Sequence, residues 1–189
     1  MPESQSTPAR ERIVQTAVKL FYKNGLRATG IDRIIAESGV AKMSFYRYFP
    51  SKSDLIAEFL HRRHDFWMEW FTTAVEEKLL ESKGGGLEVI ADVLRSWFEE
   101  PGFRGCAFIN TVAETPEYES EQNGIARDHK AQLETYVEKL ATRLGIAAPK
   151  KAAATAMIII EGTIVRAHMT GNPNVSRICK QMLKNIGNE

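Results

Sequence analysis

The segment from Ala41 to Tyr48 gathers cationic, polar and aromatic side chains that can make contacts with nucleic acid. If this segment is helical, a rotation of about 100° per residue places Phe45 and Phe49 on one side. The other side and its two flanks then carry the remaining long side chains: Lys42, Met43, Ser44, Tyr46, Arg47 and Tyr48. The phenylalanines are therefore expected to face the core and the other side chains to face outward.

The outward side chains match the groups that a DNA groove presents. Arg47 can pair with a guanine edge or a phosphate, Ser44 can donate or accept a hydrogen bond, and Met43 can contact a thymine methyl. Tyrosine hydroxyls can bind backbone phosphates. The alternative is an ordinary solvent face, which is an unusual use of two tyrosines and a methionine. The pattern favours a surface that reads a DNA groove.

Two helices before this segment can position it. The first is expected to start at Thr7-Pro8, with the proline at the first helical position, and to stop at Asn24-Gly25. One of its faces is apolar, and the opposite face carries a basic stripe: Arg12, Lys19 and Lys23. A second short helix begins near Ile31 and ends at Ser38-Gly39, where glycine suits a left-handed turn. Two short helices joined by a glycine-containing turn make a helix-turn-helix pattern, which also occurs in ordinary helical hairpins.

Charge is distributed unevenly along the 189 residues. Residues 10–52 contain nine Lys or Arg and three Asp or Glu, whereas residues 53–189 contain 16 and 20. The net charge of +1 therefore hides a basic N-terminal quarter on a mildly acidic remainder. Such a quarter is suited to a polyanion, although a charge run is more often a solvated face.

The remainder of the chain predicts further helices and no strands. Apolar residues follow helical spacing, and no segment shows an alternating pattern. The expected helices run from the Ser51–Asp54 capping box to Gly84–Gly86, and over about 87–98, 105–115, 119–144, 150–170 and 173–186. We predict an all-α protein with a helix-turn-helix domain at 1–52 and a helical ligand-binding and dimerisation domain at 53–189.

The helix from Ala152 to Met169 carries apolar or small residues on every side. Glu161, Arg166 and His168 interrupt the run, so a membrane span is not expected. A helix that is apolar all round must be covered all round. We expect residues 150–187 to form a homodimer surface; the alternative is a central helix buried in a monomer.

The middle of the chain is rich in aromatic side chains that can wall a pocket for a small molecule. The expected ligand-binding residues are Trp67, Trp70, Phe71, Trp97, Phe103, Cys106, Phe108, Asn110, Glu114, Tyr136 and Glu161. A hydrophobic or aromatic ligand is expected, with a cationic group if Glu114 or Glu161 faces the cavity. Core packing is the alternative for each aromatic residue taken singly.

Cys106 and Cys179 are the two cysteines of the chain, and they form no CxxC pair. Their number argues for a reducing compartment and against a structural zinc site. Arg104 and a helix start near Cys106 would lower the pKa of its thiol and make it an oxidant or electrophile sensor; an inert buried thiol is the commoner outcome.

Other functions receive little support from the sequence. The four histidines show no spacing that completes a catalytic or metal site, so no enzyme, metal or cofactor is expected. The polar N-terminus MPESQSTPAR contains no signal-peptide core. A cytoplasmic location is therefore expected.

The run TGIDRIIAESGVAKMSFYRYFPSKSDLI, residues 29–56, resembles the helix-turn-helix of the TetR family of bacterial transcriptional repressors. The resemblance implies a nine-helix homodimer whose first three helices bind DNA, with a ligand pocket in the later helices and a dimer interface in the last two. By position it implies phosphate contacts from Thr29, Tyr46, Tyr48 and Lys52, and groove contacts from Lys42, Met43, Ser44 and Arg47. The chain departs from the usual family pattern at Gly30 and Ala41, where Thr or Ser is common. Residues 104–115 also resemble the pocket-forming helix of one TetR subgroup.

The resulting hypothesis is a repressor that leaves a palindromic double-stranded operator when a small molecule binds. Two alternatives stay open: a redox or electrophile sensor that acts through Cys106, and a DNA-binding protein with no effector. A non-sequence-specific or architectural DNA-binding protein is a further rival.

Overall fold

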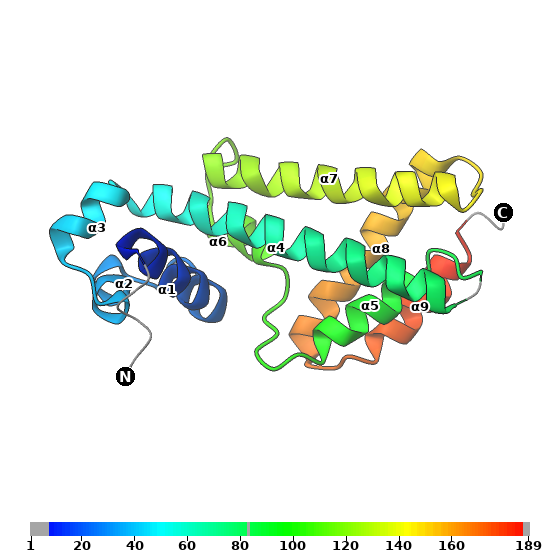
Figure 1. Ribbon diagram of the computed structural model, residues 1–189. Helices are drawn as coiled ribbons and strands as arrows, with labels where there is room; N and C mark the ends of the chain where they lie inside the picture. Colours follow the sequence, from blue (N-terminus) through cyan, green and yellow to red (C-terminus); the bar gives the residue numbers. More distant parts are fainter. Residues whose placement is uncertain (1–7, 83, 187–189) are drawn as a thin grey trace. The chain divides into compact units, whose positions relative to one another are not determined.

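The computed structural model describes residues 8–82 and 84–186, and every regular element within these ranges is a helix (Figure 1). The helices are α1 Ala9–Asn24, α2 Ile31–Ser38, α3 Lys42–Tyr48, α4 Lys52–Glu81, α5 Val89–Phe98, α6 Ala107–Glu114, α7 Glu121–Arg143, α8 Pro149–Thr170 and α9 Val175–Lys184. The predicted all-α class is confirmed.

The predicted start of the first helix is wrong by one residue. Pro8 is the residue before α1 and not its first member, because its ψ of 144° is extended rather than helical. The predicted cap at Thr7 lies outside the described residues. The predicted stop is confirmed, since Gly25 follows the last residue of α1 and its N–H donates to the Phe21 carbonyl.

The chain forms two compact units that interleave in sequence. Of the described residues, unit 1 contains 8–65 and 107–127, and unit 2 contains 66–82, 84–106 and 128–186. Helices α4 and α7 each contribute to both units. The boundary predicted between residues 52 and 53 therefore falls inside unit 1.

Ion pairs connect the first half of α4 to α1 within unit 1. Glu58 on α4 accepts from Arg10 of α1 at 2.9 Å and from Arg62 at 3.1 Å. Arg62 also reaches Glu11 of α1 at 3.0 Å. Burial raises the pKa of Glu58, but hydrogen bonds from both arginines outweigh it and hold the pKa below its ordinary value. The charged carboxylate thus links α4 to α1.

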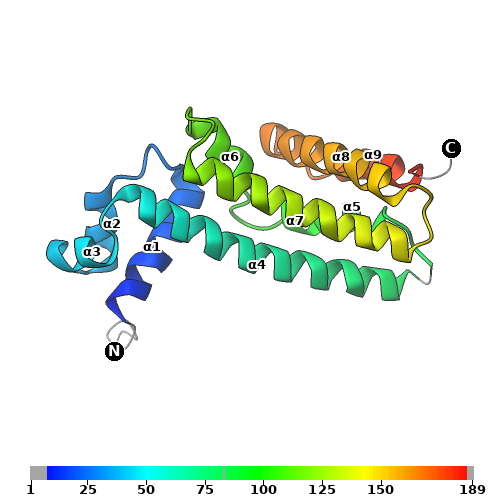
Figure 2. The same ribbon diagram turned by 90° about the horizontal axis from the view of Figure 1, so that it is seen from above.

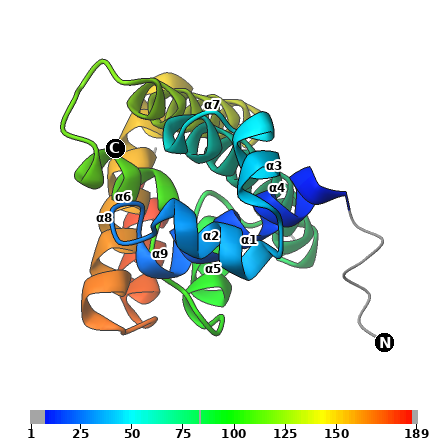
Figure 3. The ribbon, with the colours of Figure 1, turned by 90° about the vertical axis from the view of Figure 1, so that its left-hand side faces the viewer.

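Helices α1, α2 and α3 of unit 1 lie close together (Figure 3), and α1 packs against the other two. Ile13, Ile34 and Phe45, one from each helix, are completely buried. The turn between α2 and α3 depends on Gly39, whose φ of +63° lies in the left-handed region that favours glycine. Arg12 does not lie on a free basic stripe as predicted, because its guanidinium donates to the carbonyls of Ser38 and Gly39 at this turn.

Unit 2 contains the second halves of α4 and α7, which run side by side, together with α5, α8 and α9 (Figures 1 and 2). Arg143 and Tyr136 of α7 both donate to the Glu76 carboxylate of α4, at 2.7 and 3.2 Å. Helix α9 packs against both α5 and α8. Lys180 of α9 also pairs with Asp92 of α5 at 2.7 Å.

Helix α8 is the one helix of the described ranges that is long and apolar enough, by length and composition alone, to cross a membrane. In the structure its buried side contributes to the core of unit 2 through Ala152, Ala153, Ala156, Met157, Ile160, Ile164 and Ala167. Helices in the core of a protein can have the same length and apolar composition as a membrane-spanning helix.

Candidate nucleic-acid interface

Helix α3 is short, and the packing of its inward side chains stabilises it. An isolated helix of seven residues is unstable in water, so packing must stabilise it. Phe45 is completely buried and Phe49 is 3% exposed, with ring centroids 6.3 Å apart. The Arg10 guanidinium lies over the Phe49 ring at 5.2 Å. This confirms the predicted inward side of α3.

The start of α3 has no side-chain cap. Ala41 occupies the N-cap position with extended backbone, and its carbonyl accepts from the Phe45 N–H at 3.0 Å. Gly30 likewise provides no side-chain cap for α2. The absence of capping hydroxyls at these two positions makes both helices more dependent on their buried residues.

The outward face of α3 is exposed over its whole length. Met43 is 84% exposed, Tyr46 40% and Tyr48 36%, and Lys42 and Arg47 are also exposed. Ser44 is half-buried. The structure therefore brings together on one helix the six outward residues that the sequence pattern predicts.

Two contacts organise the charges of this face. Arg47 lies over the Tyr48 ring with 5.0 Å from Cζ to the ring centroid, and it also donates to the Tyr48 hydroxyl at 3.3 Å. Lys42 lies 3.6 Å from a carboxylate oxygen of Asp32 on α2. Both pairs are exposed, so a phosphate can compete for either cation.

Lys52 lies at the first position of α4, directly beside a capping box. The Asp54 N–H donates to the Ser51 hydroxyl at 3.1 Å, and the Ser51 N–H donates to the Asp54 carboxylate at 2.9 Å. Burial lowers the pKa of Lys52, and the negative charge of Glu114 opposes that shift. The predicted capping box is confirmed.

Thr29 does not fit the phosphate contact implied by the family resemblance. Its side chain is completely buried, and its hydroxyl donates to the carbonyls of Gly25 at 2.8 Å and Leu20 at 3.3 Å. A hydroxyl enclosed in this way cannot reach a phosphate. Thr29 instead fixes the turn between α1 and α2.

The aromatic members of the predicted ligand set, apart from Phe108, form a connected cluster in unit 2. Trp67 stacks on Phe71 at 4.6 Å between ring centroids and meets Trp97 edge-on at 5.7 Å. Further ring contacts join Trp70 to Trp97, Trp97 to Phe103, and Phe71 to Tyr136. The indole N–H of Trp67 is buried and has no hydrogen-bond partner in the described part of the chain.

The other predicted ligand-binding residues, Phe108 and the polar anchors among them, are divided between the units. Phe108, Asn110 and Glu114 belong to unit 1, whereas Glu161 belongs to unit 2. The Glu114 carboxylate accepts from the Arg27 backbone N–H at 2.7 Å, and Glu161 pairs with Lys130 at 3.2 Å. Both carboxylates therefore already have cationic or N–H partners.

Cys106 lies directly before α6, as predicted, but its side chain is only 7% exposed. Reactive cysteines are partly exposed in an electropositive environment. The burial of Cys106 favours the inert thiol over the sensor.

Gln122 is a residue of unit 1 that the sequence reasoning missed. It lies at the start of α7, is 8% exposed, and donates to the side chain and carbonyl of Ser53 on α4. No local sequence signal indicates this contact, because 69 positions separate the two residues.

Comparison with known proteins finds a family match that includes α3. Residues 13–59 match the family model described as bacterial regulatory proteins, tetR family. The crystal structure of SCO4454, a TetR-family transcriptional regulator from Streptomyces coelicolor, superposes with a TM-score of 0.81 and 26% identity; the match covers 95% of this chain and 94% of that one. The chain therefore contains a helix-turn-helix of the TetR family, and its fold is similar to that of a TetR-family regulator.

Curated relatives in the TetR family match mainly over the helix-turn-helix. The uncharacterized HTH-type transcriptional regulator YerO of Bacillus subtilis is 45% identical over 47 residues, 25% of this chain and 16% of that protein. The HTH-type transcriptional repressor KstR2 of Mycolicibacterium smegmatis is 29% identical over 100 residues, 52% of this chain and 46% of that protein. The chain thus spans less than half the length of these relatives.

We predict that Thr29→Val lowers the free energy of unfolding by about 1–3 kcal/mol, because the Gly25 and Leu20 carbonyls lose the single hydroxyl donor that they share. Urea titration measures the change. Thr16→Val, at a half-buried position of α1, is the control and should have a smaller effect. Unchanged stability combined with weaker DNA binding would restore Thr29 as a phosphate contact.

Proposed function

We propose that the chain is a homodimeric, DNA-binding transcriptional regulator that reads a twofold-symmetric operator with one α3 helix from each protomer. The observation that carries this proposal is the outward face of α3, where a methionine, an arginine, a lysine and two tyrosines are all exposed. The match of residues 13–59 to the TetR family model and the similarity to a TetR-family regulator support the same assignment.

The chemistry of α3 divides its residues by role. Met43 and Arg47 lie four positions apart and thus on the same side of the helix, which suits them to base edges. Tyr46, Tyr48 and Lys52 are suited to phosphates, which position the protein without reading sequence. In a symmetric dimer the two α3 helices meet half-sites about 34 Å apart or a related distance.

The dimer surface is proposed on α8 and α9, within residues 150–187, of which 150–186 are described. Both helices expose large apolar side chains: Ile158, Val165 and Met169 on α8, and Ile178 and Met182 on α9. Ile158 is 75% and Met169 81% exposed in the single protomer. Exposed apolar side chains gathered on adjacent helices mark a surface for association, and a second copy provides an apolar partner of the same shape.

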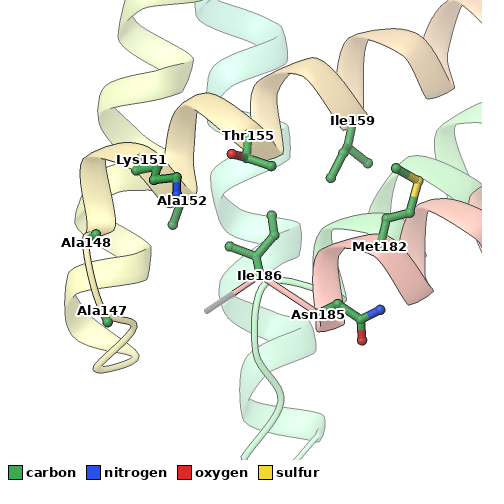
Figure 4. A pocket seen from close by; sticks show the side chains of 9 residues that line it. All are labelled: Ala147, Ala148, Lys151, Ala152, Thr155, Ile159, Met182, Asn185 and Ile186. Carbon is green, nitrogen blue, oxygen red and sulfur yellow. The ribbon is translucent and has the colours of Figure 1, made fainter. Parts of the chain in front are cut away.

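A groove of about 410 Å³ lies at one end of this surface (Figure 4). Its lining residues are Ala147, Ala148, Lys151, Ala152, Thr155, Ile159, Met182, Asn185 and Ile186. Met182 belongs both to this groove and to the exposed apolar surface. We assign the groove to the second protomer because it continues the proposed dimer surface.

The aromatic cluster of unit 2 is the proposed effector site. A buried N–H without an acceptor costs about 1–3 kcal/mol, so a ligand oxygen that accepts from Trp67 would recover that free energy. The neighbouring rings favour an apolar or aromatic ligand. This supports an uncharged, largely hydrophobic effector that carries at least one hydrogen-bond acceptor.

Repression follows if the effector prefers a conformation in which the two α3 helices no longer match the operator. The effector then shifts the population away from the DNA-binding form, with a coupling of about 1–3 kcal/mol. A regulator that senses redox state through Cys106 is less favoured, because that thiol is buried. An architectural protein would bind operator and random DNA alike, whereas a regulator prefers its operator by roughly 10³ or more.

Arg47→Ala should lose discrimination between operator and random DNA, because a bidentate contact to guanine is worth about 1–3 kcal/mol. Lys52→Ala should weaken binding to all sequences alike and reduce the slope of affinity against salt by about one. Fluorescence anisotropy across a salt series measures both effects. Lys139→Ala, an exposed charge on α7, is the control. Equal losses on both DNAs for both variants contradict the division of roles.

Ile158→Glu should convert the dimer to a monomer, because it places a charge in the proposed apolar surface. Analytical ultracentrifugation measures the molecular mass. The matched control is Leu80→Glu on α4, where the side chain is 82% exposed and lies outside that surface. A dimer that survives Ile158→Glu, or a monomeric wild type, rules out this interface.

Trp67→Phe keeps an aromatic ring but removes the unpartnered N–H. We expect 1-tetralone to raise the Tm of the wild type and of the control Trp70→Phe more than tetralin does, because only 1-tetralone has a carbonyl acceptor. The difference should vanish in Trp67→Phe. An equal response of Trp67→Phe, or none in the wild type, contradicts the assignment of the acceptor.

A further inference from the structure

Residues 107–127 contact both ends of the helix-turn-helix of unit 1. Helices α2 and α3 occupy residues 31–48. Glu114 of α6 contacts the turn that precedes α2, and Gln122 of α7 contacts the start of α4, which follows α3. We refer to Glu114 and Gln122 together as the clamp.

Glu114 holds the turn between α1 and α2 by three contacts. Its carboxylate accepts from the Arg27 backbone N–H at 2.7 Å, and its backbone carbonyl accepts from Arg27 Nε at 3.0 Å. The carboxylate also lies against Gly25, where a Cβ would be 2.9 Å from Oε1. Gly25 has a φ of +88°, so both its conformation and the approach of Glu114 require glycine. The Thr29 hydroxyl stabilises the same turn by donating to the Gly25 carbonyl.

Gln122 contacts the other end of the helix-turn-helix, at the start of α4. Its amide is buried and donates to the Ser53 hydroxyl and to the Ser53 carbonyl. Ser53 directly follows Lys52 and lies within the Ser51–Asp54 capping box. The contact therefore holds the first turn of α4 at the residue next to Lys52, a proposed phosphate contact.

We propose that Glu114 and Gln122 are positioning residues for DNA recognition, which hold the two ends of the α2–α3 element so that α3 is presented in one orientation. The inference rests on the proposed function, because it concerns how the operator is read. Neither residue needs to touch DNA. If either contact is lost, the fraction of protein with the competent orientation falls, and the apparent operator affinity falls by the same fraction.

The negative charge of Glu114 and its role as a hydrogen-bond acceptor have opposite expected effects on DNA binding. Glu114 acts electrostatically on Lys52, and any anion near a DNA-binding surface repels phosphate. Removal of this charge alone should strengthen binding to every DNA. Removal of the hydrogen-bond acceptor should weaken binding to the operator. Glu114→Gln removes the charge and keeps an acceptor, whereas Glu114→Ala removes both.

The experiment measures the affinity of the full-length chain and its variants for a selected operator duplex and for a random duplex. We expect Glu114→Ala and Gln122→Ala each to weaken operator binding about fivefold or more, with random DNA bound at least as tightly as by the wild type. Glu114→Gln should bind the operator as tightly as the wild type or more tightly. Glu117→Ala removes an exposed carboxylate three residues away and is the control.

Several outcomes overturn the clamp. Equal operator affinities of Glu114→Ala and Glu114→Gln would mean that only the charge matters, and parallel losses on both duplexes would mean general unfolding. Thermal melts check folding, and Gln122→Ala tests the proposal if Glu114→Ala does not fold. A wild type with no operator preference refutes the proposed function, whereas a normal preference that no clamp variant changes refutes the clamp alone.

Discussion

The account depends on the burial of two phenylalanines under a helix of seven residues. Phe45 and Phe49 fix the inward side of α3, which is too short to persist without such packing. Because these two residues anchor the helix, its exposed side chains are not needed to fill the core. This separation allows the outward face to expose a methionine and two tyrosines, which are more apolar than a typical solvent face, beside an arginine. In the proposed function, DNA recognition therefore depends on an apolar contact on the inward side of α3.

Much of this arrangement could be predicted from local patterns. The spacing of Phe45 and Phe49, the left-handed glycine at residue 39 and the capping box at Ser51 each act over a few residues, and each is present in the structure. The order of the helices follows from the same kind of signal. The prediction was off by one residue at Pro8, where extended backbone precedes the helix.

The rest could not be predicted, because it depends on contacts between distant parts of the chain. Thr29 resembles a phosphate ligand in sequence, but the fold encloses its hydroxyl between two carbonyls. Glu114 resembles a ligand anchor in sequence, but its carboxylate accepts a hydrogen bond from the backbone N–H of Arg27, which is 87 positions away. Arg12 resembles part of a basic stripe in sequence, but in the fold its guanidinium donates to a backbone carbonyl of the α2–α3 turn. Composition and periodicity carry no information about such partners.

The most direct test of the central claim is the selection of fragments bound by the full-length wild-type protein from a pool of random duplex DNA. The account predicts enrichment of a twofold-symmetric sequence whose half-sites lie about one helical turn, ~34 Å, or a related distance apart. Enriched fragments that show no symmetry, or no enrichment at physiological salt, would contradict it.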